Sequence, residues 1–160
     1  MKLYLDIDGV LLHTKEDVAA EHAEELIEYI TSEFDCYWLT THCKGDTEHA
    51  VKYLSEYFHK DIVEKLTKIK PTYWETLKTE AIDFDSNFIW LDDFPFQAEK
   101  EVLRNFATSE SLYTVNLSRE NEPLNILEYL KGIKAKRRKR RMVVLSVFLT
   151  LILSIVFAKC

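Results

Sequence analysis

Three short apolar runs of this sequence end in the same way, in a pair of acidic or hydroxyl residues. LYLDID at 3–8 ends in Asp6 and Asp8, YWLTT at 37–41 ends in two threonines, and FIWLDD at 88–93 ends in two aspartates. Short, largely apolar runs bounded by turn residues predict buried strands. Ligands bind beyond the carboxyl ends of the strands in an open parallel sheet, so the three polar pairs are expected to converge on one site.

The stretches between these runs follow helical spacing and indicate α/β layering with a mostly parallel sheet. Pro123 suits the first turn of the last helix, which is expected to end near Gly132. The predicted helices cover about 18–34, 47–58, 74–81, 97–105 and 123–132, and the predicted strands cover 2–7, 36–40, 88–91 and 112–115.

Charge is distributed unevenly along the 160 residues. Residues 131–160 hold nine of the 21 Lys and Arg and no Asp or Glu, which leaves 12 basic against 27 acidic residues elsewhere, a formal charge of −15. Nucleic-acid affinity depends largely on cationic neutralisation of phosphates, so a body this acidic disfavours direct nucleic-acid binding. The three cysteines, Cys36, Cys43 and Cys160, form no CxxC pair and indicate a reducing compartment.

The C-terminal segment predicts a membrane anchor. Residues 142–158 form an uncharged run of 17 residues, which as a helix spans about 26 Å at 1.5 Å per residue. The basic residues before it should stay on the cytoplasmic side, so the globular part is expected to face the cytosol. This divides the chain into a globular domain at 1–132, a basic juxtamembrane segment at 133–141 and a transmembrane helix at 142–158. Small side chains recur every four residues along the span and offer a face for self-association: Ser146, Thr150, Ser154 and Ala158.

The DID pattern at the end of the first run carries the chemistry. Residues i and i+2 of an extended segment face the same side, which places the carboxylates of Asp6 and Asp8 together, and Gly9 then allows a tight turn. Converging carboxylates are costly unless a cation lies between them, and all-oxygen coordination favours Mg²⁺. Each polar pair alone could equally be a turn or a cap, because Asp and Thr are common at strand ends.

Taken together, the motifs resemble those of phosphatases of the haloacid dehalogenase (HAD) superfamily. LDIDGV at 5–10 matches the first family motif, YWLTT the second and FIWLDD the fourth, and the resemblance covers most of residues 1–117. It implies a Rossmann-like three-layer α/β sandwich. It also implies that Asp6 attacks phosphorus to give an aspartyl-phosphate, while Asp8 protonates the leaving oxygen and later activates water.

The same resemblance implies how the remaining polar residues bind phosphate and metal. Thr40 would hydrogen-bond the phosphoryl group. Asp92, with Asp93 beside it, would hold Mg²⁺ together with Asp6 and the backbone carbonyl of Asp8.

The third family motif is a lysine, and two residues compete for it. Lys70 precedes a proline, as the motif lysine does in many HAD phosphatases. Lys78 lies one helix before the fourth motif, and the string at 74–93 resembles small capless HAD proteins associated with RNA-repair systems. We favour Lys78 and keep Lys70 as the alternative.

Few residues separate Gly9 from the helix expected near Asp17, so no folded cap fits and the site should be open. Capless members of the family act on large substrates or rely on a partner to close the site.

The resemblance and the tail together predict a Mg²⁺-dependent phosphomonoester hydrolase, tethered to a membrane, with its domain in the cytosol and a phosphorylated substrate of unknown class. The alternative is a membrane-anchored binding or adaptor module that keeps the fold with little turnover. Retention of both Asp6 and Asp8 argues against this alternative, because a module freed from catalysis has no physical need for the second carboxylate. If the apolar tail is not native to the chain, a soluble phosphatase is left.

Overall fold

The structure is a computed structural model that describes the backbone of residues 1–16 and 18–157 and the side chains of residues 1–16, 18–140 and 142. The chain divides into two compact units, Met1–Leu124 and Asn125–Cys160. The polar strand ends all lie in the first unit.

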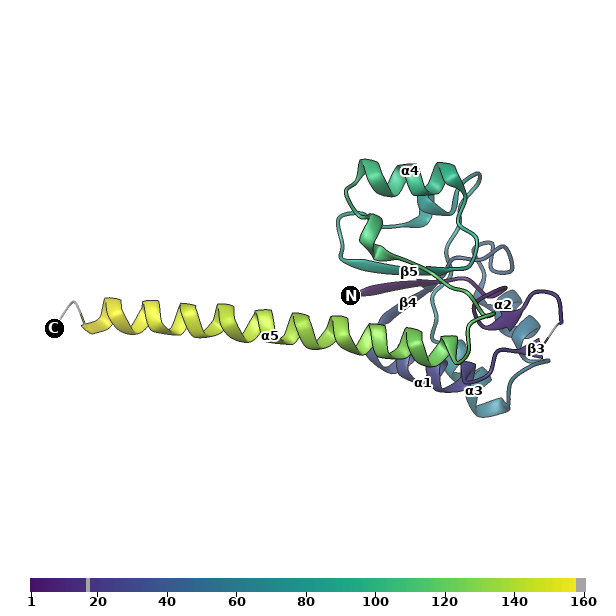
Figure 1. Ribbon diagram of the computed structural model, residues 1–160, viewed down its shortest axis with the longest axis horizontal. Coiled ribbons are helices and arrows are strands. Elements are labelled where there is room, and N and C mark those ends of the chain that lie inside the picture. The colour runs from purple at the N-terminus through teal and green to yellow at the C-terminus, as the bar shows by residue number, and fades with distance from the viewer. Residues whose placement is uncertain (17, 158–160) are drawn as a thin grey trace. The chain divides into compact units, whose positions relative to one another are not determined.

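A four-stranded parallel sheet forms the centre of the first unit (Figure 1). β1 lies between β4 and β5, and Tyr4 of β1 is opposite Tyr37 on one side and Trp90 on the other. The parallel sheet and the helices between its strands confirm the predicted α/β fold class. The strands, in their spatial order, are β4 (Asp35–Trp38), β1 (Lys2–Leu5), β5 (Phe88–Asp92) and β6 (Leu112–Thr114).

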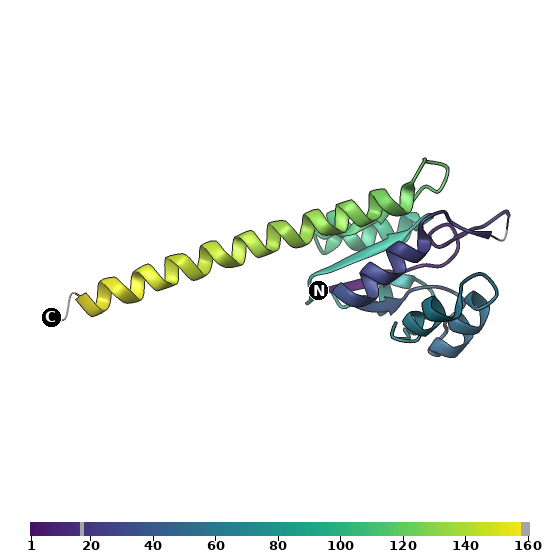
Figure 2. The same cartoon turned by 90° about the horizontal axis from the view of Figure 1, so that it is seen from below.

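Helices cover both faces of this sheet. α4 (Gln97–Asn105) lies on one face, whereas α1 (Ala23–Glu33) and α3 (Lys60–Leu66) lie on the other (Figures 1 and 2). α2 (Thr47–Leu54) contacts α3, and two short 3₁₀ turns, η1 (Lys78–Ala81) and η2 (Ser109–Ser111), contact α4.

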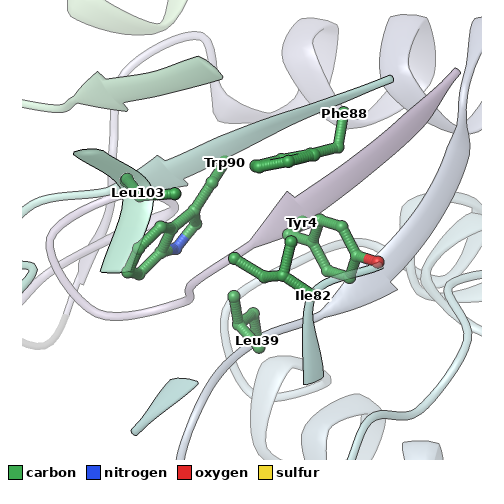
Figure 3. Packing of buried hydrophobic residues seen from close by; sticks show 6 residues of the cluster. All are labelled: Tyr4, Leu39, Ile82, Phe88, Trp90 and Leu103. Carbon is green, nitrogen blue, oxygen red and sulfur yellow. The ribbon is translucent and has the colours of Figure 1, made fainter. Parts of the chain in front are cut away.

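Aromatic side chains from β1 and β5 fill the core on the face covered by α4. Because side chains alternate along a strand, Phe88 and Trp90 both point to this face, as Figure 3 shows. Burying an apolar side chain of this size contributes about 1.5–3 kcal/mol, so the cluster fixes the register of the two central strands. Its members are Tyr4, Leu39, Ile82, Phe88, Trp90 and Leu103.

The chain after Gly9 differs from the prediction. Val18 and Ala19 form β3 (Val18–Ala19), which pairs antiparallel with β2 (Leu12–His13), and α1 begins only at Ala23. The hydrogen bond from Ala20 N to Leu11 O, at 2.8 Å, holds this extended segment to the preceding strand. The prediction of a helix start near Asp17 was therefore wrong, although Asp17 itself lies outside the described residues.

The helix predicted over 74–81 is also reduced, to the single turn η1. The Glu80 carboxylate accepts hydrogen bonds from the backbone N–H groups of Glu75, Thr76 and Leu77. These bonds bring three successive N–H groups to one side chain and hold residues 75–77 in a loop before η1.

The last helix, α5 (Glu122–Phe157), continues through Gly132, where the sequence predicted an end. A single glycine inside a helix costs about 1 kcal/mol, and the Lys and Arg residues that follow are good helix formers. Among the residues that the structure describes, no helix is long and apolar enough to cross a membrane. The predicted span at 142–158 lies outside the described side chains, apart from Met142.

Candidate active site

Three carboxylates meet at the carboxyl ends of β1 and β5. Leu5 pairs with Leu91 in register, so the next residue of each strand, Asp6 and Asp92, emerges at the same edge of the sheet. One carboxylate oxygen from each of Asp6, Asp92 and Asp93 lies within 4.8 Å of the others. Asp6 is 8% exposed and Asp92 only 1%, so two of these charges are largely removed from water.

Lys78 is the cation that the structure brings to this cluster. Its Nζ donates to Oδ2 of Asp6 and, at 2.5 Å, to Oδ2 of Asp92. Burial alone would lower the pKa of the Lys78 ammonium, but the charges of Asp6 and Asp92 outweigh burial and hold this pKa above its ordinary value. Lys78 is therefore a fixed positive charge beside both carboxylates.

Lys70, the alternative candidate, lies elsewhere. Its Nζ is 2.6 Å from Oδ1 of Asp35 and lies over the Tyr37 ring, 5.2 Å from the centroid. Asp35 begins β4, whereas the clustered carboxylates lie at or just after the carboxyl ends of their strands. The structure thus brings Lys78, and not Lys70, to Asp6, while the role of Lys78 in binding phosphate stays a prediction.

A buried glutamate fixes the position of Lys78. Glu99, 2% exposed, accepts from the backbone N of Lys78 at 2.8 Å and from the backbone N of Phe96 at 2.7 Å. Phe96 lies just after the two aspartates at the end of β5. One carboxylate therefore ties the lysine-bearing turn to the segment that carries two of the clustered acids.

Asp8 and Thr40 lie at the same end of the sheet, but outside the group of three carboxylates. Oδ2 of Asp8 lies 2.8 Å from Nε2 of His42, in the turn that follows β4. Thr40 is 1% exposed, and its Oγ1 accepts from the backbone N of His42 at 3.4 Å. His42 thus joins the polar ends of β1 and β4.

Gly9 permits the close approach of Asp93. Its φ of +70° is unfavourable for other residues, and a Cβ at this position would lie 2.1 Å from Cγ of Asp93. The expectation of a tight turn at Gly9 is confirmed by this φ. The close contact with Asp93 is a second requirement for glycine at this position, and the sequence did not reveal it.

An open cavity of about 530 Å³ adjoins the cluster at Asp93. Its walls are residues 13–16 of the β2–β3 hairpin and residues 114–119, from the last residue of β6 onward, together with Gly9. Most of these side chains are polar, and they include the basic residues Lys15 and Arg119. The cavity suits a polar group better than an apolar one.

The chemistry of the cluster fits a hard divalent cation. Burial and the charge of Asp6 raise the pKa of Asp92 to about 7, although Lys78 opposes this rise. The same two causes raise the pKa of Asp93. Carboxylate oxygens that repel one another in this way gain most from a cation, and an all-oxygen set suits hard divalent cations such as Mg²⁺ and Ca²⁺ alike.

Comparison of the chain with protein-family models, curated proteins and solved structures finds no significant match.

Two residues of the site did not emerge from the sequence, His42 and Glu99. His42 directly follows the threonine pair at the end of β4, and that position was a usable signal. Glu99 stands three residues after Phe96, which is the spacing of a capping box. Its second bond, to the backbone of Lys78, joins residues 21 positions apart and has no local signature.

Proposed function

We propose that this chain is a Mg²⁺-dependent phosphomonoester hydrolase of the HAD type that works through an aspartyl-phosphate on Asp6. The observation that carries the proposal is the contact of Lys78 with both Asp6 and Asp92, beside Asp93. A cation held between strand-end carboxylates is what a site needs if it is to receive a phosphate dianion. The resemblance of the three strand-end motifs to those of HAD phosphatases supports the same chemistry.

In the first step, a carboxylate oxygen of Asp6 attacks phosphorus and the bond to the ester oxygen breaks. Asp8 gives a proton to the departing oxygen. Water then attacks phosphorus, Asp8 takes a proton from this water, and the bond between phosphorus and Asp6 breaks. Inorganic phosphate leaves, and Asp6 is a free carboxylate again.

The three clustered carboxylates and the backbone carbonyl of Asp8 would hold Mg²⁺, which when bound offsets the repulsion between carboxylates and phosphate. Lys78 supplies a second positive charge from the protein itself. Thr40, at the end of β4, would donate its hydroxyl to a phosphoryl oxygen.

The access to the site supports an open, capless enzyme. Among the described residues between Gly9 and α1, the chain forms only the short β2–β3 hairpin, and the cavity beside Asp93 is open and polar. We propose that the leaving group of the substrate occupies this cavity.

The basic and apolar C-terminal segments support a further part of the proposal, that the chain is anchored in a membrane with its domain in the cytosol.

Purified full-length protein, screened with phosphosugars, nucleotides, phosphopeptides and phosphorylated oligonucleotides, tests the proposal. We expect Mg²⁺-dependent release of phosphate that falls to background in Asp6→Asn, which preserves shape but removes the attacking charge. Beryllofluoride, a mimic of the aspartyl-phosphate, should bind the wild type only with Mg²⁺ and should not bind Asp6→Asn. Activity that persists in folded Asp6→Asn would falsify the mechanism, and a lack of both activity and beryllofluoride binding would favour a binding module.

A further inference from the structure

His42 holds the carboxylate of Asp8 in place. Its Nε2 lies 2.8 Å from Oδ2 of Asp8, and among the described residues no other side chain hydrogen-bonds this carboxylate. The Asp8 side chain is 37% exposed at an open site, so without this partner it would be free to change rotamer.

The His42 ring is itself fixed by elements other than the loop that carries Asp8. It stacks on Tyr53 of α2, with 4.2 Å between ring centroids and 5° between ring planes. Its backbone N also donates to Thr40 Oγ1, at 3.4 Å, directly after β4. The position of Nε2 is therefore set by α2 and β4, and through it these elements set the direction of Asp8.

We propose that His42 is a positioning residue that aims Asp8 at the leaving-group oxygen. With Nε2–H donating to Oδ2, the other oxygen, Oδ1, is left to transfer the proton in both half-reactions. This inference depends on the proposed phosphatase function, because aim matters only if Asp8 exchanges protons with the substrate and water.

The effect of a misaimed Asp8 depends on the leaving group. An alkoxide leaves slowly unless a proton reaches it during bond cleavage, whereas p-nitrophenolate is stable enough to leave without one. A link that only kept the turn after β4 in shape would affect both kinds of substrate alike. The ratio of the two rates therefore separates positioning from general support of the fold.

The experiment compares kcat/KM for benzyl phosphate and p-nitrophenyl phosphate, using the full-length chain with Mg²⁺. This parameter covers the steps up to departure of the leaving group, so a slow second half-reaction does not mask the difference. His42→Phe keeps a ring against Tyr53 but lacks Nε2. We expect it to lower kcat/KM about 30-fold for benzyl phosphate and less than about threefold for p-nitrophenyl phosphate, since general acids contribute about 10²–10⁴-fold.

Two further variants sharpen the comparison. His42→Gln keeps a side-chain N–H donor and should recover part of the loss on benzyl phosphate. His49→Phe is the matched control, because His49 also faces an aspartate, with Nδ1 3.7 Å from Oδ2 of Asp46, but is 74% exposed on α2. The His49→Phe variant should leave kcat/KM unchanged for both substrates.

If His42→Phe lowers kcat/KM equally for both substrates, or lowers it for neither, the proposal is overturned. If that variant does not fold, Tyr53→Leu removes the stacking partner instead. The Tyr53→Leu variant should also lower kcat/KM selectively for benzyl phosphate, but by a smaller factor. An equal loss of kcat/KM for both substrates in this variant counts against the proposal too. Absence of Mg²⁺-dependent activity in the wild type is a different result, which overturns the proposed function itself.

Discussion

Three carboxylates and one ammonium meet in the candidate site, and this imbalance governs what single residues do there. Asp6, Asp92 and Asp93 approach within 4.8 Å, whereas Lys78 contacts only the first two of them. Without a divalent cation, the native state holds more negative charge at this place than Lys78 can balance. Removing one carboxylate and binding a divalent cation should both reduce this excess of negative charge. The two changes should therefore affect the stability of the native state in related ways.

Mg²⁺ should raise the melting temperature of the wild type, and it should raise that of Asp92→Asn much less. A ligand at 100 times its Kd adds about 2.7 kcal/mol, and each kcal/mol shifts the melting temperature of a chain this size by about 2–4 °C. Calorimetry with Mg²⁺ and with EDTA measures both shifts. Equal shifts in the two proteins would show that Asp92 does not hold the ion.

The pH dependence of the metal-free protein has a definite sign. The pKa of Asp92 is raised by burial and by Asp6 to about 7, whereas an unfolded Asp titrates near about 4. Between these values the native state binds a proton that the unfolded chain has lost, so stability falls as pH rises through this window. Denaturation in EDTA at several pH values should show this fall in the wild type and a smaller fall in Asp92→Asn. Equal slopes would contradict the prediction.

Lys78→Ala should lower kcat/KM by a few orders of magnitude, because a buried cation beside a transferring phosphoryl group is commonly worth about 3–4 kcal/mol. Lys70→Ala provides the comparison, since Lys70 pairs with Asp35 at the start of β4 and should affect turnover little. Steady-state kinetics of both variants checks the order. The reverse order would assign the phosphate-binding role to Lys70 after all.

At the scale of elements, the site depends on how η1 and α4 are joined. The turn η1 is only four residues long and cannot hold Lys78 by itself. Glu99, at the start of α4, bonds the backbone N of Lys78 and that of Phe96 with its two oxygens. The position of the lysine is therefore a property of two elements and not of one.

Glu99→Gln should cost stability and activity together. Glutamine keeps the size of the side chain, but its amide nitrogen would face a backbone N–H that needs an acceptor. An unsatisfied buried group of this kind costs about 1–3 kcal/mol, and a displaced Lys78 should lower kcat/KM as well. Urea denaturation and kinetics measure the two effects. A neighbouring control, Glu101→Gln, changes an exposed glutamate of the same helix and should alter neither.

The sequence predicted the helices and strands that a local residue pattern indicates. It missed the contacts between residues that lie far apart in the chain. The strands around Leu5, Trp38 and Trp90 are apolar runs, and each of them forms a strand of the sheet. The helix predicted over 74–81 was wrong for residues 74–77, where the Glu80 carboxylate binds the backbone N–H groups of a loop, a contact that helical spacing does not indicate. Likewise, the pairing of His42 with Asp8 spans 34 positions and follows only from the parallel order of β4 and β1.

At the scale of the whole molecule, charge separates the chain into two unlike parts. Residues before 131 carry a formal charge of −15, whereas residues 131–141 hold eight basic side chains and no acidic one. Anionic lipid attracts a basic segment with about 1 kcal/mol for each Lys or Arg near the surface and repels an acidic domain. This asymmetry supports the proposal that the chain is held to a membrane by its end, with the site on the cytosolic side.

The full-length chain should sediment with membranes and resist extraction by carbonate, while a chain truncated after Gly132 should stay in the supernatant. The reason is the uncharged run at 142–158, whose 17 residues lie at the low edge of the range of about 17–25 residues that crosses a hydrocarbon core. Leu151→Arg tests insertion directly, because a charge at the centre of a span costs about 2.5–3.5 kcal/mol and should release part of the protein. Arg140→Lys, which preserves charge outside the run, is the matched control. Recovery of the wild type as a soluble, folded monomer would contradict the membrane anchor. The orientation is tested separately, in sealed vesicles with their cytosolic face outward, where digestion of the domain by external protease would confirm that it faces the cytosol.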